Sequence, residues 1–369
     1  MDNVTRREFT KLGALGLAAQ AMPAAVAQAQ QADARTGYAV IGLGRIADHF
    51  LRATRDSKTS RVTGLVSGHR DKALRIAAEY GVPESAVYSY EDMDRMKDNQ
   101  QIQAVYVALP NSMHAEYTLR SAKAGKHVLC EKPMAISVAE CEAMIGACKA
   151  ANVKLMIAYR CQYDPLHLKA IQLIRDGNIG TLNVIQGAFG GPQPVGEWRI
   201  TKKLGGGGSL MDLGIYPLNA SRYLAGEEPV EFKAFTSTND HDGRFNEVEE
   251  NITWTMRFPS GVLANCTSSY GAHMPGYFKV AGSKGWIEMA PAYNYDGMRL
   301  RASYRNADGH SEEIDETSPD KDPIEFVRQM DHFTTCIRQN QTPHTPGEEG
   351  LRDMEHMKAI YKSAGIDIL

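Results

Sequence analysis

Short apolar strand patterns alternate with helical patterns between residues 37 and 159, and this alternation limits the fold more than any other feature. Strands joined by crossover helices form a parallel sheet that the helices cover on both faces. Strands are expected at 37–42, 61–67, 103–108, 127–130 and 154–159, and helices at 46–54, 71–80, 113–124 and 138–150. We therefore predict a doubly wound α/β domain of the Rossmann type over residues 31–158.

The pattern changes after Tyr159, where β-rich runs follow one another with few helices between them. Such a succession indicates a largely antiparallel sheet. Strands are expected at 181–189, 229–237, 248–258, 261–269, 276–290 and 298–304, and helices at 164–175, 209–224, 323–339 and 347–364. Residues 159–369 are predicted to form an α+β domain that binds substrate and carries an oligomer interface, because its open sheet face would otherwise be exposed.

The turn after the first predicted strand, Gly42 to Ala47, reads G-L-G-R-I-A and fits G-x-G-x-x-A. Two glycines here allow a tight turn and a close approach to a pyrophosphate at the helix N-terminus. An ordinary glycine turn has the same pattern, but its place between the first strand and helix favours dinucleotide binding. The expected contacts in this turn are Gly42, Leu43, Gly44, Arg45 and Ile46.

The end of the second predicted strand bears on which nicotinamide cofactor binds. NAD enzymes usually carry Asp or Glu there, bonded to the ribose 2′-hydroxyl. This chain has Ser67 and Gly68 instead, followed by Arg70 and Lys72. A hydroxyl with two nearby cations suits the 2′-phosphate of NADP. The alternative is that Arg70 and Lys72 are solvated residues of the first helical turn.

The first 30 residues have the features of an export signal. Arg6-Arg7 is followed by a short apolar run and by Ala25-Val26-Ala27, an A-x-A cleavage pattern. We predict a twin-arginine signal peptide over residues 1–30 and a periplasmic protein, exported after folding. The alternative is an amphipathic N-terminal helix on a cytosolic protein.

Composition excludes several classes of partner. The net charge of −3 shows no basic face for nucleic acid. Beyond the leader, no apolar run reaches the ~20 residues that span a bilayer. The six cysteines have no C-x-x-C or zinc-site spacing. We expect no metal, and buried thiols in place of most disulfides, because folding would precede export.

Three further segments carry a resemblance to a known family. They are Ala108–His114, Ala124–Pro133 with Glu131-Lys132-Pro133, and Gly205–Pro217 with the pattern D-x-G-x-Y. Together they resemble the Gfo/Idh/MocA oxidoreductases over nearly the whole chain after the leader. Residues 159–165 and Trp198-Arg199 resemble the glucose–fructose and aldose–aldose oxidoreductase branch.

Lys132, Asp212 and Tyr216 are the candidate catalytic residues. Lys132 follows the carboxyl end of a predicted strand, the edge where doubly wound sheets bind ligands. Asp212 and Tyr216 are four residues apart, so one helical face can present both. The resemblance implies that Tyr216 is the acid/base, that Lys132 lowers its pKa and bonds the reacting oxygen, and that Asp212 orients Lys132 or the sugar. Singly, Lys132 could be a surface lysine and Tyr216 a core tyrosine.

Other residues are weaker candidates. Arg160 is expected to hold cofactor or sugar, and Trp198 and Arg199 to contact the cofactor, although each could instead close a domain interface. Gly205–Gly208 is interpreted as a flexible approach to the catalytic helix. The remaining cofactor contacts that the family segments imply are Leu109, Pro110, Asn111, His114, Glu131 and Lys132, with His114 more structural than the others.

These observations lead to one functional hypothesis and three rivals. We expect a tightly bound, non-covalent NADP that accepts hydride from one aldose, giving a lactone, and returns it to a second sugar, giving an alditol. The rivals are a sugar dehydrogenase with exchangeable NAD(P), a nicotinamide-dependent glycosidase, and a non-catalytic sugar or dinucleotide sensor. The expected partners are sugars and a second copy of the chain, as a homodimer or homotetramer.

Overall fold

The structure, a computed structural model, describes residues 34–306 and 308–367. Thr36–Leu369 forms one compact unit. The signal peptide predicted for residues 1–30 lies outside the described residues. Within the part of the chain that is described, no helix is long and apolar enough to cross a bilayer.

Six parallel strands form the first sheet, in the order β3-β2-β1-β4-β5-β6. They are β1 (Thr36–Ile41), β2 (Ser60–Val66), β3 (Val87–Tyr88), β4 (Ala104–Val107), β5 (His127–Cys130) and β6 (Leu155–Ile157). The intervening helices are α1 (Arg45–Asp56), α2 (Arg70–Tyr80), α3 (His114–Lys123) and α4 (Val138–Ala150), with shorter turns η1 (Glu84–Ala86), η2 (Met93–Asp98) and η3 (Asn111–Met113). The fully buried β1 and β4 are typical of a sheet covered on both faces, and the predicted doubly wound fold is confirmed.

Eight strands form the second sheet, in the order β14-β13-β12-β11-β7-β10-β9-β8. They are β7 (Leu182–Gly190), β8 (Glu231–Ser237), β9 (Asn251–Arg257), β10 (Leu263–Ser269), β11 (Met274–Gly282), β12 (Gly285–Met289), β13 (Arg299–Arg305) and β14 (Ser311–Thr317). In the described sheet, neighbours are antiparallel except β7 and β10. The mainly antiparallel sheet is therefore confirmed.

Two expectations about this sheet are corrected. The single strand expected at 276–290 is the hairpin β11–β12, which turns at Ser283 and Lys284. Strand β14 was not expected, because its sequence S-E-E-I-D-E-T has no buried face and therefore little apolar alternation to detect. It lies at the sheet edge beside β13, and charged side chains are usual on an edge strand.

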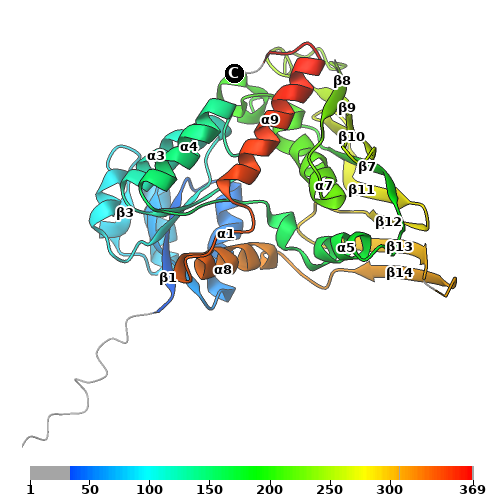
Figure 1. Cartoon of the computed structure of the whole chain (residues 1–369). Coiled ribbons are helices and arrows are strands. Elements are labelled where there is room, and N and C mark those ends of the chain that lie inside the picture. Colours follow the sequence, from blue (N-terminus) through cyan, green and yellow to red (C-terminus); the bar gives the residue numbers. More distant parts are fainter. Residues whose placement is uncertain (1–33, 307, 368–369) are drawn as a thin grey trace, which may run out of the picture. The chain divides into compact units, whose positions relative to one another are not determined.

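The C-terminal helices pack against the first sheet as well as the second. Helix α8 (Ile324–Arg338) packs against α1, and its Thr334 hydroxyl lies 3.0 Å from the hydroxyl of Tyr38 in β1. Helix α9 (Gly347–Ser363) contacts α4, β6 and β8. Figure 1 shows α5 (Pro165–Arg175) and α7 (Ile215–Ala225) along one face of the second sheet. The two sheets thus share one folded unit although the chain enters the second near residue 159.

The helix predicted at 209–224 has an irregular start. Leu210–Gly214 forms a π-helical turn, η6, which continues directly into α7. Pro217 therefore falls in the first turn of α7, where an N–H is not needed for a helical bond. The irregularity of this helix therefore lies just before Pro217. Single π turns in helices frequently mark functional sites.

Candidate active site

One long cleft of about 820 Å³ contains most of the candidate residues. It opens at the carboxyl ends of β1, β4 and β5, where the strand order reverses between β1 and β4. Ligands of doubly wound folds bind at this switch point. The far wall comes from the second sheet and its connections, including Phe189, Trp198 and Tyr293. The cleft therefore joins the predicted cofactor residues to the predicted catalytic residues.

The glycine turn fits a pyrophosphate. Gly42 has φ +86°, and a Cβ there would lie 2.5 Å from the Ala108 carbonyl oxygen. A Cβ on Gly44 would meet nothing within 4 Å, so open space lies before α1. Within the described residues, no side chain caps the N-terminus of α1. Its first backbone N–H groups and the positive end of its dipole remain available to a phosphate. These residues fit a dinucleotide.

The four residues predicted to select NADP divide into two pairs. Ser67 and Lys72 line the cleft, and the Lys72 ammonium donates to the Leu43 carbonyl at 2.5 Å. Arg70 instead pairs with Glu84 at 2.7 Å, on an exposed surface. Gly68 and Arg70 are not among the cleft residues. Of the two cations predicted for the 2′-phosphate, Lys72 lines the cleft and Arg70 does not.

At the other end of the cleft, Lys132, Asp212 and Tyr216 come together. Lys132 follows β5 and precedes a cis peptide bond to Pro133. Its ammonium donates to the Asp212 carbonyl oxygen at 2.8 Å and to Asp212 Oδ1 at 3.0 Å. The same nitrogen lies 4.7 Å from the ring centroid of Tyr216. Since an ammonium has three donors, one N–H remains for a ligand oxygen.

Asp212 lies between two cations. The Arg199 Nε is 3.2 Å from Asp212 Oδ2, opposite the Lys132 contact. Burial alone would raise the pKa of Asp212, but the charges of Lys132 and Arg199 outweigh it and lower the pKa. Glu197 in turn contacts Arg199 at 2.8 Å and Arg45 at 3.3 Å. Alternating charges therefore connect the glycine turn to Lys132.

Tyr216 lies among aromatic rings and is largely withdrawn from water. The rings of Phe189 and Tyr293 lie 5.4 and 5.3 Å from it. Burial raises the pKa of the Tyr216 phenol, and the opposing cation is Arg160. Lys132, the cation that the resemblance implies for this effect, lies 4.7 Å from the ring centroid and is paired with Asp212.

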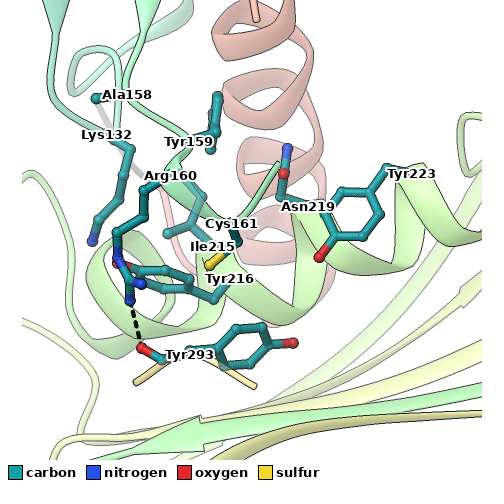
Figure 2. A pocket seen from close by; sticks show the side chains of 10 residues that line it. All are labelled: Lys132, Ala158, Tyr159, Arg160, Cys161, Ile215, Tyr216, Asn219, Tyr223 and Tyr293. Carbon is teal, nitrogen blue, oxygen red and sulfur yellow. Dashed lines mark hydrogen bonds between the residues drawn. The ribbon is translucent and has the colours of Figure 1, made fainter. Parts of the chain in front are cut away.

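A small second cavity lies beside the catalytic residues. Its volume is about 20 Å³ and its wall is mainly apolar. Figure 2 shows Lys132, Arg160 and Tyr216 on one side of it and Asn219 and Tyr223 on the other. A cavity of this size and polarity has no room for a sugar. Of the two cavities lined by Lys132 and Tyr216, the long cleft is thus the one with room for a sugar.

The chain has extensive similarity to known oxidoreductases. Residues 36–159 match the family described as oxidoreductase family, NAD-binding Rossmann fold, and residues 167–288 match the GFO/IDH/MocA C-terminal domain. D-xylose 1-dehydrogenase [NADP(+)] of Haloarcula marismortui is 32% identical over 335 residues, covering 89% of this chain and 90% of that protein. The chain belongs to the Gfo/Idh/MocA oxidoreductase family.

Solved structures of Gfo/Idh/MocA type extend this similarity. The aldose–aldose oxidoreductase of Caulobacter crescentus, solved with glycerol, has 44% sequence identity and a TM-score of 0.85, and the match covers 90% of this chain and 98% of that one. Among curated relatives, 1,5-anhydro-D-fructose reductase of Ensifer adhaerens is 25% identical, covering 89% of this chain and 96% of that protein. The family and the two-sheet fold predicted from the sequence are thereby confirmed.

Most of the remaining predicted contacts of this Gfo/Idh/MocA site also line the cleft. They are Leu43, Arg45, Ile46, Leu109, Pro110, Asn111, Glu131, Arg160, Trp198 and Arg199. His114 does not: it is 1% exposed, and its ring nitrogens face the carbonyls of Pro133 and Leu109 at 2.8 and 2.9 Å. His114 therefore supports the backbone of two segments, one at Leu109 among the predicted cofactor contacts and one at Pro133 after Lys132.

The Gly205–Gly208 segment is not a flexible approach. All four glycines are buried, and the Gly208 N–H donates to the Glu249 carboxylate at 2.9 Å. The Leu210 N–H and the Tyr361 hydroxyl donate to the other Glu249 oxygen, each at 2.9 Å. The Glu249 carboxylate thus accepts the N–H groups on both sides of the start of η6 and holds this backbone in place.

Several residues at the site had not been predicted. Tyr293 and Tyr295 follow β12 in the segment A-P-A-Y-N-Y-D-G, where two aromatic residues in a turn-rich sequence were a usable signal. Glu197 precedes the predicted Trp198, but nothing local marked it as a partner of Arg45. Glu325 lies in an ordinary helix sequence, and only packing reveals its contact with Arg160. Within the described residues, no group of His, Cys, Asp and Glu side chains is arranged to hold a metal ion.

Proposed function

We propose that this protein is an exported, NADP-dependent aldose oxidoreductase that keeps its cofactor tightly bound. It oxidises one aldose to the lactone and reduces a second aldose or ketose to the alditol, in a ping-pong cycle. The observation that carries the proposal is the meeting of Lys132, Asp212 and Tyr216 at the end of a cleft that begins at the glycine turn. The proteins named above act on sugars or their derivatives, and 44% identity with an aldose–aldose oxidoreductase supports this substrate class.

The chain's own residues supply the proton chemistry. Bound NADP would accept the hydride from C1 of the first sugar and return it to the second. Tyr216, as the phenolate, takes the proton of the C1 hydroxyl, while the third N–H of Lys132 bonds that oxygen. Asp212 holds Lys132 in place through the 3.0 Å contact. In the second half-cycle, the Tyr216 phenol returns its proton to the oxygen of the accepting carbonyl.

The predicted export of the chain supports a retained cofactor. A protein that folds before twin-arginine export can carry a nucleotide with it, and no soluble nicotinamide pool exists outside the cytoplasm. Recycling by a second sugar then regenerates the cofactor where it is bound. The cleft supports the same conclusion, since residues of both sheets enclose it.

The test begins with purified, undialysed protein. Denaturation is expected to release NADP in about one equivalent per chain. The native protein, without added nucleotide, should convert pairs of aldoses to equal amounts of lactone and alditol, and Tyr216→Phe should not. If the protein releases no nucleotide and converts sugars only with added NADP, it is instead a dehydrogenase with an exchangeable cofactor. The NADP-dependent xylose dehydrogenase relatives favour this second candidate.

We also propose that two copies of the chain associate through the open face of the second sheet. Exposed Val184, Leu263 and Phe235 lie on this sheet, with Phe235 77% exposed. Apolar side chains on a sheet surface are usually covered by a partner. Light scattering should show a dimer or larger oligomer, and Phe235→Glu with Leu263→Glu should dissociate it.

A further inference from the structure

Arg160 begins η4 (Arg160–Tyr163), three residues after the end of β6, and its charge is buried. The residue is 5% exposed and forms an ion pair with Glu325 of α8, which is 2% exposed. Its guanidinium also donates to the backbone carbonyls of Tyr293 and Asn294. An arginine remains charged when buried, so this charge acts on whatever lies beside it. Both terminal nitrogens of this guanidinium donate to groups of the protein.

The group beside it is Tyr216. The Arg160 Cζ lies 5.5 Å from the Tyr216 ring centroid, and Figure 2 shows the two side chains next to each other. The titratable groups that face Tyr216 come from four elements: Glu131 and Lys132 after β5, Arg160 and Cys161 in η4, Asp212 in η6, and Tyr293 and Tyr295 after β12.

These neighbours differ in whether their charge is compensated close to Tyr216. The Lys132 ammonium is matched by Asp212, which itself faces the phenol and raises its pKa, as Glu131 does. Arg160 lowers the pKa of Tyr216 against the larger effect of burial. Glu325 contacts Arg160 from α8 and does not line the cleft. Arg160 is thus a second cation beside the phenol, next to Lys132, and its partner carboxylate lies outside the cleft.

We propose that the buried Arg160–Glu325 pair positions and electrostatically adjusts Tyr216 for proton transfer, with Arg160 favouring the phenolate and Glu325 moderating that effect. Both are positioning residues that act through Tyr216. The inference rests on the proposed function only for the role of Tyr216 as acid/base.

Opposite charges predict opposite effects. In Glu325→Gln the carboxylate that partly cancels Arg160 is lost, while two backbone carbonyls and the amide oxygen of glutamine still hold the guanidinium. The phenolate of Tyr216 becomes easier to form. In Arg160→Gln/Glu325→Gln the cation is lost as well, and no unpaired buried charge remains to unfold the protein. The phenolate becomes harder to form. Arg160→Lys keeps the charge and should behave nearly as the wild type.

The first measurement needs no turnover. Holoenzyme labelled with carbon-13 at tyrosine Cζ is titrated by NMR, and the Tyr216 signal is assigned by its absence in Tyr216→Phe. The Tyr216 titration in Glu325→Gln should lie at least about one pKa unit below that in the double variant, a tenfold difference in phenolate at a given pH. If the Tyr216 signal has the same pH dependence in both variants, up to the highest pH at which they remain folded, the inference is overturned.

The second measurement is single-turnover reduction of the bound cofactor by an aldose as a function of pH. The rise in rate with pH should move to lower pH in Glu325→Gln and to higher pH in the double variant. A merely structural role would change the rate or the KM of both variants and leave the position of this rise unchanged. If the NMR signals separate but no aldose is oxidised, the pair acts as inferred and the proposed function is wrong.

Discussion

The two ends of the cleft are built in different ways. The cofactor end is built around one continuous segment, which consists of β1, the turn with Gly42 and Gly44, and the open N-terminus of α1; further predicted contacts follow β2 and β4. The catalytic end combines Lys132, Asp212 and Tyr216 with Arg160 and residues from both sheets. The first end is partly exposed, with the Arg45 side chain 82% exposed, whereas the Lys132 and Asp212 side chains are 13% and 16% exposed.

This difference determines what each end can do. An exposed backbone turn binds a phosphate with N–H groups, whose protonation does not depend on neighbouring charges. A proton-transfer site needs a withdrawn phenol whose protonation depends on its neighbours, and burial strengthens each of those interactions. We therefore expect substitutions at the catalytic end to act on rate and pH dependence, and those at the cofactor end to act on backbone stability and nucleotide affinity.

The largest effect is expected for Tyr216→Phe. Loss of the acid/base hydroxyl should lower the rate of aldose oxidation by about 10²–10⁴-fold, because general acid–base catalysis contributes that much. The aromatic contacts with Phe189 and Tyr293 are kept, so stability and nucleotide content should not change. Single-turnover kinetics, a thermal melt and the nucleotide content of the purified variant measure these quantities. Wild-type rates in this variant would contradict the site assignment.

At the cofactor end, Gly42→Ala is expected to destabilise the fold. Its φ of +86° and the nearby Ala108 carbonyl oxygen should cost about 1–3 kcal/mol. Gly44→Ala is the matched control, because a Cβ there meets nothing within 4 Å. The control should fold with wild-type stability and lose nucleotide affinity alone. Denaturant unfolding with and without NADP separates the two effects, and equal losses of stability would show that the turn is not constrained as described.

Asp212→Asn tests the charge compensation at the catalytic end. The folded-state pKa of Asp212 is lowered, so its contribution to stability is full above the unfolded value of about 3.9 and is lost as pH falls through the folded pKa. The variant should lose about 1.5–3 kcal/mol at neutral pH, because bonds to Lys132 and Arg199 weaken. The difference from the wild type should shrink below about pH 4.

Asp315→Asn is the control for that experiment. Asp315 also has a lowered pKa, through its hydrogen bond to Arg299, but this pair is exposed on the second sheet. Solvent and salt screen such pairs, so its loss should have little effect on unfolding at physiological ionic strength. If Asp212→Asn and Asp315→Asn lower the free energy of unfolding equally, burial does not distinguish the Asp212 site from the exposed Asp315 pair.

The smallest effect is expected for Lys72→Ala. Loss of one ammonium near the ribose should weaken NADP binding about tenfold and leave NAD binding nearly unchanged. Arg70→Ala is the control, because Arg70 pairs with Glu84 outside the cleft. Fluorescence titration of refolded, nucleotide-free protein gives both affinities. If Arg70→Ala costs more than Lys72→Ala, the assignment of the phosphate-binding cation is wrong.

Much of the fold and the cofactor end was predictable from local sequence. The alternating strands and the G-x-G-x-x-A turn are short-range patterns, and the structure contains them where expected. Strand β14 was missed because it has no buried face, and the β11–β12 turn because β-rich sequence continues through it. The Gly205–Gly208 segment was misinterpreted because Glu249, the acceptor of its N–H groups, lies some 40 residues away in sequence.

By itself, the amino-acid sequence determined the doubly wound sheet, the family, the glycine turn and the residues Lys132, Asp212 and Tyr216. Each of these depends on neighbours within one element or on a short motif. Only the tertiary structure decided that Lys72 rather than Arg70 faces the cleft, and that Arg160, paired with Glu325, lies beside Tyr216. Electrostatic effects depend on distance and burial in space, and Glu325 reaches Arg160 only because α8 packs against η4.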